Sequence, residues 1–115
     1  MRLGGKITNP GDLRTRIDLV DIVRSQDAGG FYHVTELPGK AVWASWKNAF
    51  GLEAMRAAAE GVEISATVRV RFLAGLNNSW RVRKGGETYE IITDVDDIGE
   101  RHEYMEFKVR RYEAA

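Results

Sequence analysis

The sequence predicts a mainly β protein, built as a small antiparallel β-barrel or strongly bent sheet with one short inserted helix. The first observation is a stretch at 79–95 that is typical of a β-hairpin closed by Gly85 and Gly86. The second is the strict alternation of apolar and polar residues at 62–72. The third is that only 48–60 departs from the strand pattern towards a helical one. Strands joined by hairpins with one inserted helix are typical of small bent sheets and barrels.

Length and composition indicate one folded domain and exclude several classes of protein. The chain has 115 residues, 43% of them hydrophobic and 30% charged, which suits a single domain with a modest core. Lys plus Arg and Asp plus Glu number 17 each, so no overall field attracts nucleic acid or an anionic membrane. The absence of cysteine excludes disulfides and thiolate zinc sites, and it fits an intracellular or virion protein. No apolar run approaches the roughly 20 residues of a membrane helix, so we expect no membrane partner.

We expect a flexible N-terminal arm, residues 1–12, followed by a single β-barrel domain, residues 13–115. Two adjacent glycines and the turn-like Asn9, Pro10 and Gly11 predict the arm. Two interpretations of the arm remain open: a frayed terminus, and a segment that becomes ordered only on assembly.

The domain begins with two strand-like stretches. Residues 13–24 alternate like a strand, but the parity of the apolar side chains changes near Leu19, which predicts a bulge or bend there. A glycine-containing turn at 25–31 follows. A second strand is predicted at 32–47, interrupted at 38–39 by Pro-Gly.

The second strand has apolar side chains on both faces of its segment 40–47. Trp43 lies on one parity, while Val42, Ala44 and Trp46 lie on the other. Such a pattern indicates either burial on both sides or a face that contacts a partner.

Residues 48–60 are the helical candidate. Asn48 is a plausible N-cap and Gly61 a plausible C′ residue. The alanines of this stretch favour a helix, whereas Gly51 disfavours one. Two interpretations stay open: a helix packed across a mouth of the barrel, and a loop that becomes helical on contact with a partner.

The stretch 62–72 predicts a strand with one apolar and one polar face. Its apolar face holds Val62, Ile64, Ala66, Val68, Val70 and Phe72. A connection at 73–78 leads into the central hairpin, and an acidic turn at 94–100 leads out of it into a last strand at 101–112. The inward side chains predicted for that last strand are Met105, Phe107 and Val109.

The register of the central hairpin follows by counting outward from Gly85 and Gly86. The predicted opposed pairs are Lys84–Glu87, Arg83–Thr88, Val82–Tyr89, Arg81–Glu90 and Trp80–Ile91. In this register the large apolar side chains share one face and the charged ones share the other. We therefore expect the barrel core to contain Trp80, Val82, Tyr89 and Ile91.

A set of arginines on the polar faces would form one basic stripe if their strands are neighbours. The candidates for this stripe, facing a DNA channel or a partner, are Arg69, Arg71, Arg81 and Arg83. No aromatic residues interleave with them on that face, so stacking of single-stranded bases is not expected. A solvated charged face is the competing interpretation.

No catalytic, cofactor-binding or metal site is predicted. The acidic turn 94–100 resembles an EF-hand loop in part, with Gly99 at the sixth position, but Ile98 and Met105 occupy positions that need oxygen ligands. His33 and His102 have no metal-binding spacing to another ligand. No nucleophile–base motif is present, so we expect a protein that is not an enzyme and needs no cofactor.

The order of these motifs resembles the tailed-phage head–tail joining proteins, also called head–tail adaptor or stopper proteins. The resemblance covers nearly the whole chain. Its most specific parts are TVRVRF at 67–72 and the spaced run of Arg81, Gly85, Tyr89, Glu90, Ile91 and Val95. It implies a β-barrel with a helix or long loop inserted between strands. It also implies rings of identical subunits in the virion neck, with a portal or adaptor protein above and a tail protein below. Such rings extend the DNA channel, close it after packaging and dock the tail.

On this resemblance the chain is predicted to be a structural neck (connector) protein, present in the host cytoplasm during assembly, with non-specific contact with packaged DNA. A candidate assembly surface consists of Trp43, Trp46, Phe50, Leu52 and Met55. Two alternatives remain: a tail-completion or other neck protein, and a small-barrel module that binds nucleic acid.

Overall fold

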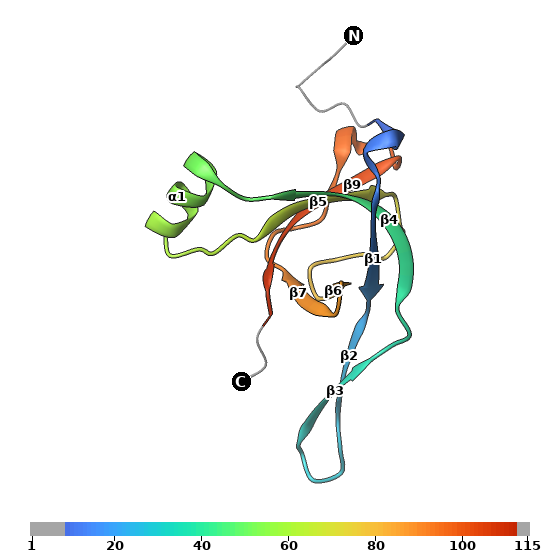
Figure 1. The fold of residues 1–115 in the computed structure, drawn as a ribbon. Helices are drawn as coiled ribbons and strands as arrows, with labels where there is room; N and C mark the ends of the chain where they lie inside the picture. Colours follow the sequence, from blue (N-terminus) through green and yellow to red (C-terminus); the bar gives the residue numbers. More distant parts are fainter. Residues whose placement is uncertain (1–8, 113–115) are drawn as a thin grey trace.

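Six antiparallel strands close into a barrel in the computed structural model, which describes residues 9–112 (Figure 1). The strands follow the order β5-β4-β1-β6-β7-β9, and pairing of β5 with β9 closes the ring. Their bounds are β1 (Thr15–Val20), β4 (Lys40–Asn48), β5 (Ala66–Arg71), β6 (Arg81–Lys84), β7 (Glu87–Ile91) and β9 (Tyr104–Arg111). The predicted fold class is therefore confirmed, and closure decides for a barrel over an open bent sheet.

The remaining elements lie outside this ring. A two-stranded sheet is formed by β2 (Ile22–Gln26) and β3 (Tyr32–Glu36), and a short strand β8 (Asp96–Asp97) adds to β9. The helices are η1 (Pro10–Asp12), α1 (Gly51–Ala59) and η2 (Ile98–Glu100). In Figure 1 the β2–β3 hairpin extends below the barrel and α1 extends to its left. No helix within residues 9–112 is long and apolar enough to cross a membrane.

The barrel interior is filled by side chains that alternate inward along each strand. Its buried cluster consists of Ile17, Leu19, Ala44, Ala66, Val68, Val70, Leu76, Val82, Tyr89, Ile91, Met105, Phe107 and Val109. No buried polar or charged residue occurs among the described residues. The three side chains predicted to point inward from the last strand are all in this cluster, so that prediction is confirmed.

The central hairpin has the predicted register. The paired residues are Lys84–Glu87, Arg83–Thr88, Val82–Tyr89 and Arg81–Glu90. Gly85 and Gly86 have φ angles of 59° and 84°, the positive values that a two-residue hairpin turn requires. Trp80 precedes β6 and so makes no ladder pair with Ile91, but it packs against the core cluster that contains Ile91. The predicted common apolar face is confirmed.

The predicted bend of the first strand lies two residues beyond Leu19. Strand β1 continues through Val20, which is buried, and the strand pattern breaks at Asp21. After the break the chain leaves the barrel, because β2 pairs only with β3 among the described strands. The predicted interruption at 38–39 is confirmed, since it separates β3 from β4.

The predicted start of the strand at residue 62 was four residues too early. Strand β5 starts at Ala66, and Val62 is 40% exposed. The chain between α1 and β5 must first return to the barrel, and its first ladder contact there is the Ser65 amide donating to the Val109 carbonyl at 2.8 Å. An alternating pattern cannot form a strand where no neighbouring strand satisfies its backbone.

The C-terminal end of α1 agrees with the prediction, but its N-terminal end does not. Gly61 is the C′ residue with φ +78°, and the Val62 amide donates to the Ala57 carbonyl at 2.8 Å, a Schellman arrangement. The prediction of Asn48 as N-cap was wrong. Phe50 occupies the cap position without a side-chain hydrogen bond, because β4 extends to Asn48 and delays the helix start.

The predicted N-terminal arm falls mainly on residues 1–8, which lie outside the described residues. Of the rest, Pro10–Asp12 form the turn η1. The Asn9 side chain accepts a hydrogen bond from the Gly11 amide at 2.9 Å, as its turn-like sequence predicts.

Candidate assembly surfaces

Three members of the predicted assembly surface lie together on the α1 arm, defined as residues 49–64. Phe50, Leu52 and Met55 are 82%, 61% and 70% exposed. The segment contains a helix, Gly51–Ala59, that projects away from the barrel, so the expectation of a helix packed across a mouth of the barrel was wrong (Figure 1). The other interpretation, a loop that becomes helical on contact with a partner, stays a prediction. An ion pair of 2.5 Å between Glu53 Oε1 and Lys108 Nζ links the helix to β9.

The two tryptophans of β4 lie on opposite faces, as their parity predicts. Trp43 is 54% exposed on the outer face, where the Arg16 guanidinium lies 5.0 Å from its ring centroid. Trp46 is half-buried and packs edge-on against Tyr89 with ring centroids 4.9 Å apart. The five predicted residues therefore do not form one patch, because Trp46 borders the core and Trp43 lies on a different side of the barrel from the helix.

The condition for a single basic stripe is not met. Strands β5 and β6 are not neighbours, because β4 and β1 separate them on one side of the barrel and β9 and β7 on the other. Arg69 and Arg71 on β5 therefore form one pair, and Arg81 and Arg83 on β6 form another. The alternation of side chains along each strand predicts that these arginines lie on the outer face of the barrel. It does not show which strands are neighbours.

Arg69, Arg81 and Arg83 each have a carboxylate within ion-pair distance, and the two arginines of β6 share one. Arg69 Nη2 lies 2.9 Å from Glu106 Oε1. Both Arg81 and Arg83 form ion pairs with Glu36 at the end of β3, Arg81 at 3.6 Å. Arg81 also lies 4.2 Å from the centroid of the Tyr112 ring.

An open polar groove of about 670 Å³ adjoins the Glu36 ion pairs. Its lining residues are Glu36, Arg81, Arg83, Gly86, Glu87, Thr88, Arg111 and Tyr112. Within the groove Arg111 Nη2 pairs with Glu87 Oε1 at 2.6 Å. The groove thus has both signs of charge in contact with each other, with the arginines Arg81, Arg83 and Arg111 against the carboxylates of Glu36 and Glu87.

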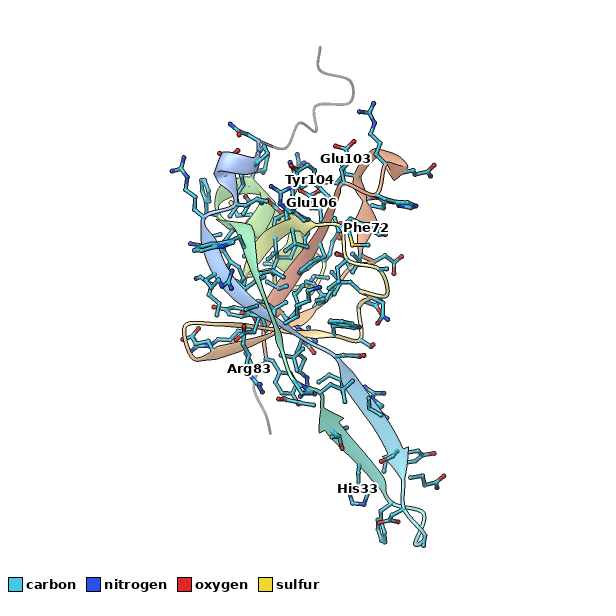
Figure 2. All side chains as sticks on the ribbon, turned by 90° about the vertical axis from the view of Figure 1, so that its right-hand side faces the viewer. His33, Phe72, Arg83, Glu103, Tyr104 and Glu106 are labelled. Carbon is cyan, nitrogen blue, oxygen red and sulfur yellow. The ribbon has the colours of Figure 1, made fainter. Side chains whose placement is uncertain are left out.

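The β2–β3 hairpin is a second exposed element, which the sequence did not single out. Phe31, Tyr32, Val34 and Val23 are 72%, 77%, 52% and 42% exposed. Figure 2 shows Arg83 beside the base of this hairpin and His33 towards its tip. The change of parity near Leu19 was the available signal, since it marks the point where the strand leaves the core.

The tip of the hairpin is ordered by Asp27. Its Oδ1 accepts hydrogen bonds from the Gly29 and Phe31 amides, each at 2.9 Å, and its Oδ2 lies 2.8 Å from His33 Nε2. These bonds, that to His33 foremost, lower the pKa of Asp27 below its ordinary value of 3.8. Asp27 therefore acts as a local cap on the turn.

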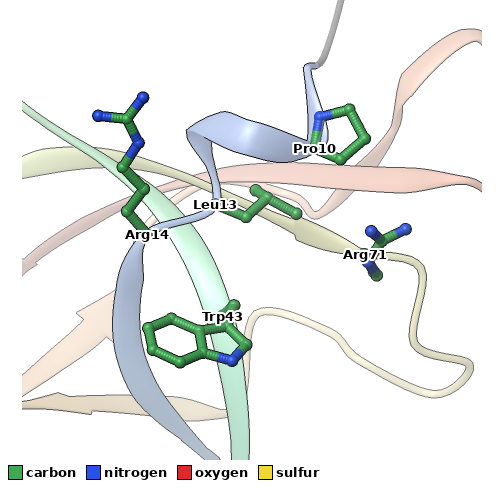
Figure 3. Close-up of a pocket in the computed structure, with 5 residues that line it drawn as sticks. All are labelled: Pro10, Leu13, Arg14, Trp43 and Arg71. Atoms are coloured by element: carbon green, nitrogen blue, oxygen red, sulfur yellow. The ribbon is translucent and has the colours of Figure 1, made fainter.

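A second hollow, of about 420 Å³, lies beside Trp43 (Figure 3). We call it the Trp43 pocket, and its lining residues are Pro10, Leu13, Arg14, Trp43 and Arg71. Arg14 is held by its Nε, which donates to the Gly11 carbonyl at 2.8 Å, and Arg71 lies 5.7 Å from the Tyr104 ring centroid. The pocket combines an apolar floor with two guanidinium groups.

The acidic turn and the histidines form local turn contacts. Asp97 accepts a hydrogen bond from the His102 amide at 3.0 Å, and its other carboxylate oxygen bonds to the His102 ring. Within residues 9–112 no group of three or more His, Cys, Asp and Glu side chains is placed to hold a metal ion.

Known proteins with a similar sequence or fold include one protein family and two solved structures. The family model of phage head completion proteins matches residues 8–111. The solution structure of a protein from Shigella flexneri 2a is 24% identical, with a TM-score of 0.63 over 90% of this chain and 96% of that one. A chain in the virion of a native gene transfer agent particle is 20% identical, with a TM-score of 0.56 over 89% and 97%. No curated protein matches.

The two solved structures share the fold of this chain across nearly their whole length, which agrees with a barrel that has inserted arms. The family model extends from before η1 to the last residue of β9, so it includes the barrel, the hairpin and the helix. The resemblance predicted from sequence is confirmed: this chain is a phage structural protein and belongs to the phage head completion protein family.

Proposed function

We propose that this chain is a connector protein of the phage neck, which forms a ring below the portal, joins head to tail and helps to close or extend the DNA channel. Membership of the head completion family supports a role in the particle. The similar chain in a gene transfer agent virion supports a location in the virion. In this proposal a portal or adaptor protein lies above the ring and a tail protein below it, after assembly in the host cytoplasm.

The observation that supports assembly most directly is a set of exposed apolar side chains on two segments outside the barrel. The barrel has a buried core of its own, yet Phe50 and Met55 on the α1 arm and Phe31 and Tyr32 on the hairpin are each at least 70% exposed. Contiguous exposed apolar side chains are typical of protein–protein contacts. Segments that project in different directions from the barrel suit contacts between unlike surfaces of successive subunits, which a ring requires (Figure 1).

The charge distribution supports a channel wall that DNA can slide past. The net formal charge is zero, and the arginines of β6 are paired with Glu36. Each unpaired cation that neutralises a phosphate strengthens DNA binding and makes it more dependent on salt. Where the cations have a carboxylate partner, as on β6, contact with DNA is weak and non-specific, and the role in this proposal is structural rather than catalytic.

The test is to remove the protein from a phage that encodes it and to examine the particles by electron microscopy. The proposal predicts heads and tails that remain separate, and joined particles when the protein is supplied. Density for the returned subunits should lie as a ring between portal and tail. Joined particles in the absence of the protein would contradict the proposal, and density on the tail alone would instead favour a tail-completion protein.

A further inference from the structure

The Trp43 pocket and the α1 arm lie at opposite ends of strand β5. The arm enters β5 at Ala66, and Arg71 at the other end of the strand lines the pocket. Five steps along a strand separate these residues by about 17 Å. In Figure 1 the helix extends to the left, whereas η1, β1 and the adjoining part of β4 lie on the right. One subunit therefore has a projection on one side and a hollow on the other.

The pocket side carries cations that have no carboxylate partner in the described part of the chain. Arg14 contacts a backbone carbonyl, Arg16 lies over Trp43, and Arg71 lies over Tyr104. This differs from β6, whose two arginines are both paired with Glu36. The pocket thus combines a net positive rim with an apolar floor.

The α1 arm has the complementary composition. Its apolar side chains Phe50, Leu52 and Met55 are exposed, and none of them belongs to the core cluster. Glu60 and Glu63 at the end of the arm are exposed and form no ion pair with any described residue. The arm therefore has exposed apolar side chains and two carboxylates without an ion-pair partner among the described residues, against one exposed cation, Arg56. This composition is complementary to an apolar floor with guanidinium groups at its rim.

We propose that the α1 arm of one copy docks into the Trp43 pocket of the next copy. Apolar side chains of the arm cover Trp43 and Leu13, and its carboxylates pair with Arg14, Arg16 or Arg71. The contact joins unlike surfaces, so its repetition produces a closed ring or a filament. It rests on the proposed ring-forming function and names the two surfaces that meet. DNA is a weaker candidate for the pocket, because phosphates would pair with the arginines but leave the apolar floor uncovered.

Cross-linking between single-cysteine variants tests this contact, because the native chain has no cysteine. Ala58→Cys marks the arm. Asp12→Cys, in η1 between the lining residues Pro10 and Leu13, marks the pocket side. Both sites are exposed, and neither substitution removes an arginine, an apolar anchor or a free carboxylate of the arm. With a short bismaleimide, a concentrated mixture of the two variants should yield covalent dimers, whereas each variant alone should yield few. Ser25→Cys on the exposed hairpin is the matched control, and it should not cross-link to Ala58→Cys.

A charge exchange separates a specific contact from chance collision. Glu60→Arg with Glu63→Arg in the arm variant should lower the dimer yield at least several-fold, as should Arg14→Glu with Arg71→Glu in the pocket variant. Combining the two exchanged surfaces should restore it. Two outcomes would overturn the pairing of these charges. In the first, the dimer yield falls when either surface is exchanged and does not recover when the two exchanged surfaces are combined. In the second, the dimer yield falls with neither exchange.

The same cysteine variants, incorporated into particles, distinguish failure of this contact from failure of the proposed function. Particles that contain the protein but show no cross-link between the two sites would overturn the contact and leave the ring intact. Particles that lack the protein would overturn the proposed function, and the purified mixture would then decide the contact alone. A cross-link from Asp12→Cys to another virion protein, or loss of the dimer on addition of duplex DNA, would assign the pocket to a different occupant.

Discussion

The carboxylate of Glu36 and the guanidinium of Arg83 form an ion pair that connects the base of the β2–β3 hairpin to strand β6 of the barrel. Arg81 reaches the same carboxylate at 3.6 Å. The residues are 47 positions apart in sequence, so this pairing exists only because β6 lies beside β1, where the hairpin begins. It therefore links the base of the hairpin to the barrel wall.

Removal of this carboxylate should loosen the hairpin without unfolding the barrel. In Glu36→Gln we expect the free energy of unfolding to fall by no more than about 1 kcal/mol, since the pair is partly exposed. The Leu37 amide, which donates to the Asp21 carbonyl at 3.0 Å, should exchange with solvent up to about fivefold faster. Hydrogen exchange measures this, with Glu63→Gln as the control for loss of an exposed carboxylate. Unchanged exchange at the base would show that backbone pairing alone orients the hairpin.

Truncation of Tyr89 should destabilise the barrel strongly. Tyr89 is 9% exposed and packs edge-on against Trp46, while its hydroxyl donates to Glu87 Oε2 at 3.1 Å. Tyr89→Ala should lower the free energy of unfolding by about 3–5 kcal/mol because it leaves a cavity. Tyr89→Phe keeps the ring and should cost about 1 kcal/mol. Urea unfolding measures both, and equal losses would mean that the hydroxyl rather than the packing matters.

The two tryptophans of β4 should differ in their contribution to stability. Trp46→Ala removes a ring packed on the core and should lower the free energy of unfolding by about 2 kcal/mol or more. Trp43→Ala removes an exposed ring with one cation–π contact and should cost about 1 kcal/mol or less. Urea unfolding of the two variants, matched in chemistry and on the same strand, checks the difference. A larger loss for Trp43→Ala would mean that the outer face is covered in the isolated subunit.

Substitutions on the α1 arm should impair assembly more than folding. Phe50→Ala and Met55→Ala remove side chains that are 82% and 70% exposed, so the melting temperature should change little. Both should reduce the number of joined particles when they replace the native protein in a phage that lacks it. Arg56→Ala, an exposed change on the same helix, is the control and should support normal joining. Normal numbers of joined, DNA-filled particles with both variants would place the working surface elsewhere.

The tip of the hairpin should lose order in acid. The pKa of Asp27 is lowered in the folded protein, with the His33 hydrogen bond as the main cause. A lowered pKa means that the native turn favours the carboxylate, so its stabilising effect is present above pH 3.8 and is lost as the pH falls through the lowered folded value. NMR signals of the Gly29 and Phe31 amides should report this loss of order. Asp27→Asn should weaken the order of the turn already at neutral pH. Chemical shifts of these two amides that stay constant as the pH is lowered would contradict the capping role of Asp27.

Local features of the sequence were sufficient to predict the hairpin and the inward faces of the strands. Gly85 and Gly86 adopt the positive φ values that the turn needs, and the register of four residue pairs follows from them. Alternation in β5 and β9 likewise assigned Val68, Val70, Phe107 and Val109 to the core. These predictions succeeded because backbone preference and side-chain parity act between residues that are close in the chain.

Only the tertiary structure decided which strands adjoin, and hence what the exposed residues can do. Closure of the barrel pairs β5 with β9, separates Arg69 from Arg81, and pairs Arg83 with Glu36. It also places α1 and the Trp43 pocket on opposite sides of the barrel. Side-chain parity says which face a residue occupies but nothing about the neighbouring strand, because strand order depends on burying the apolar faces of the whole chain at once.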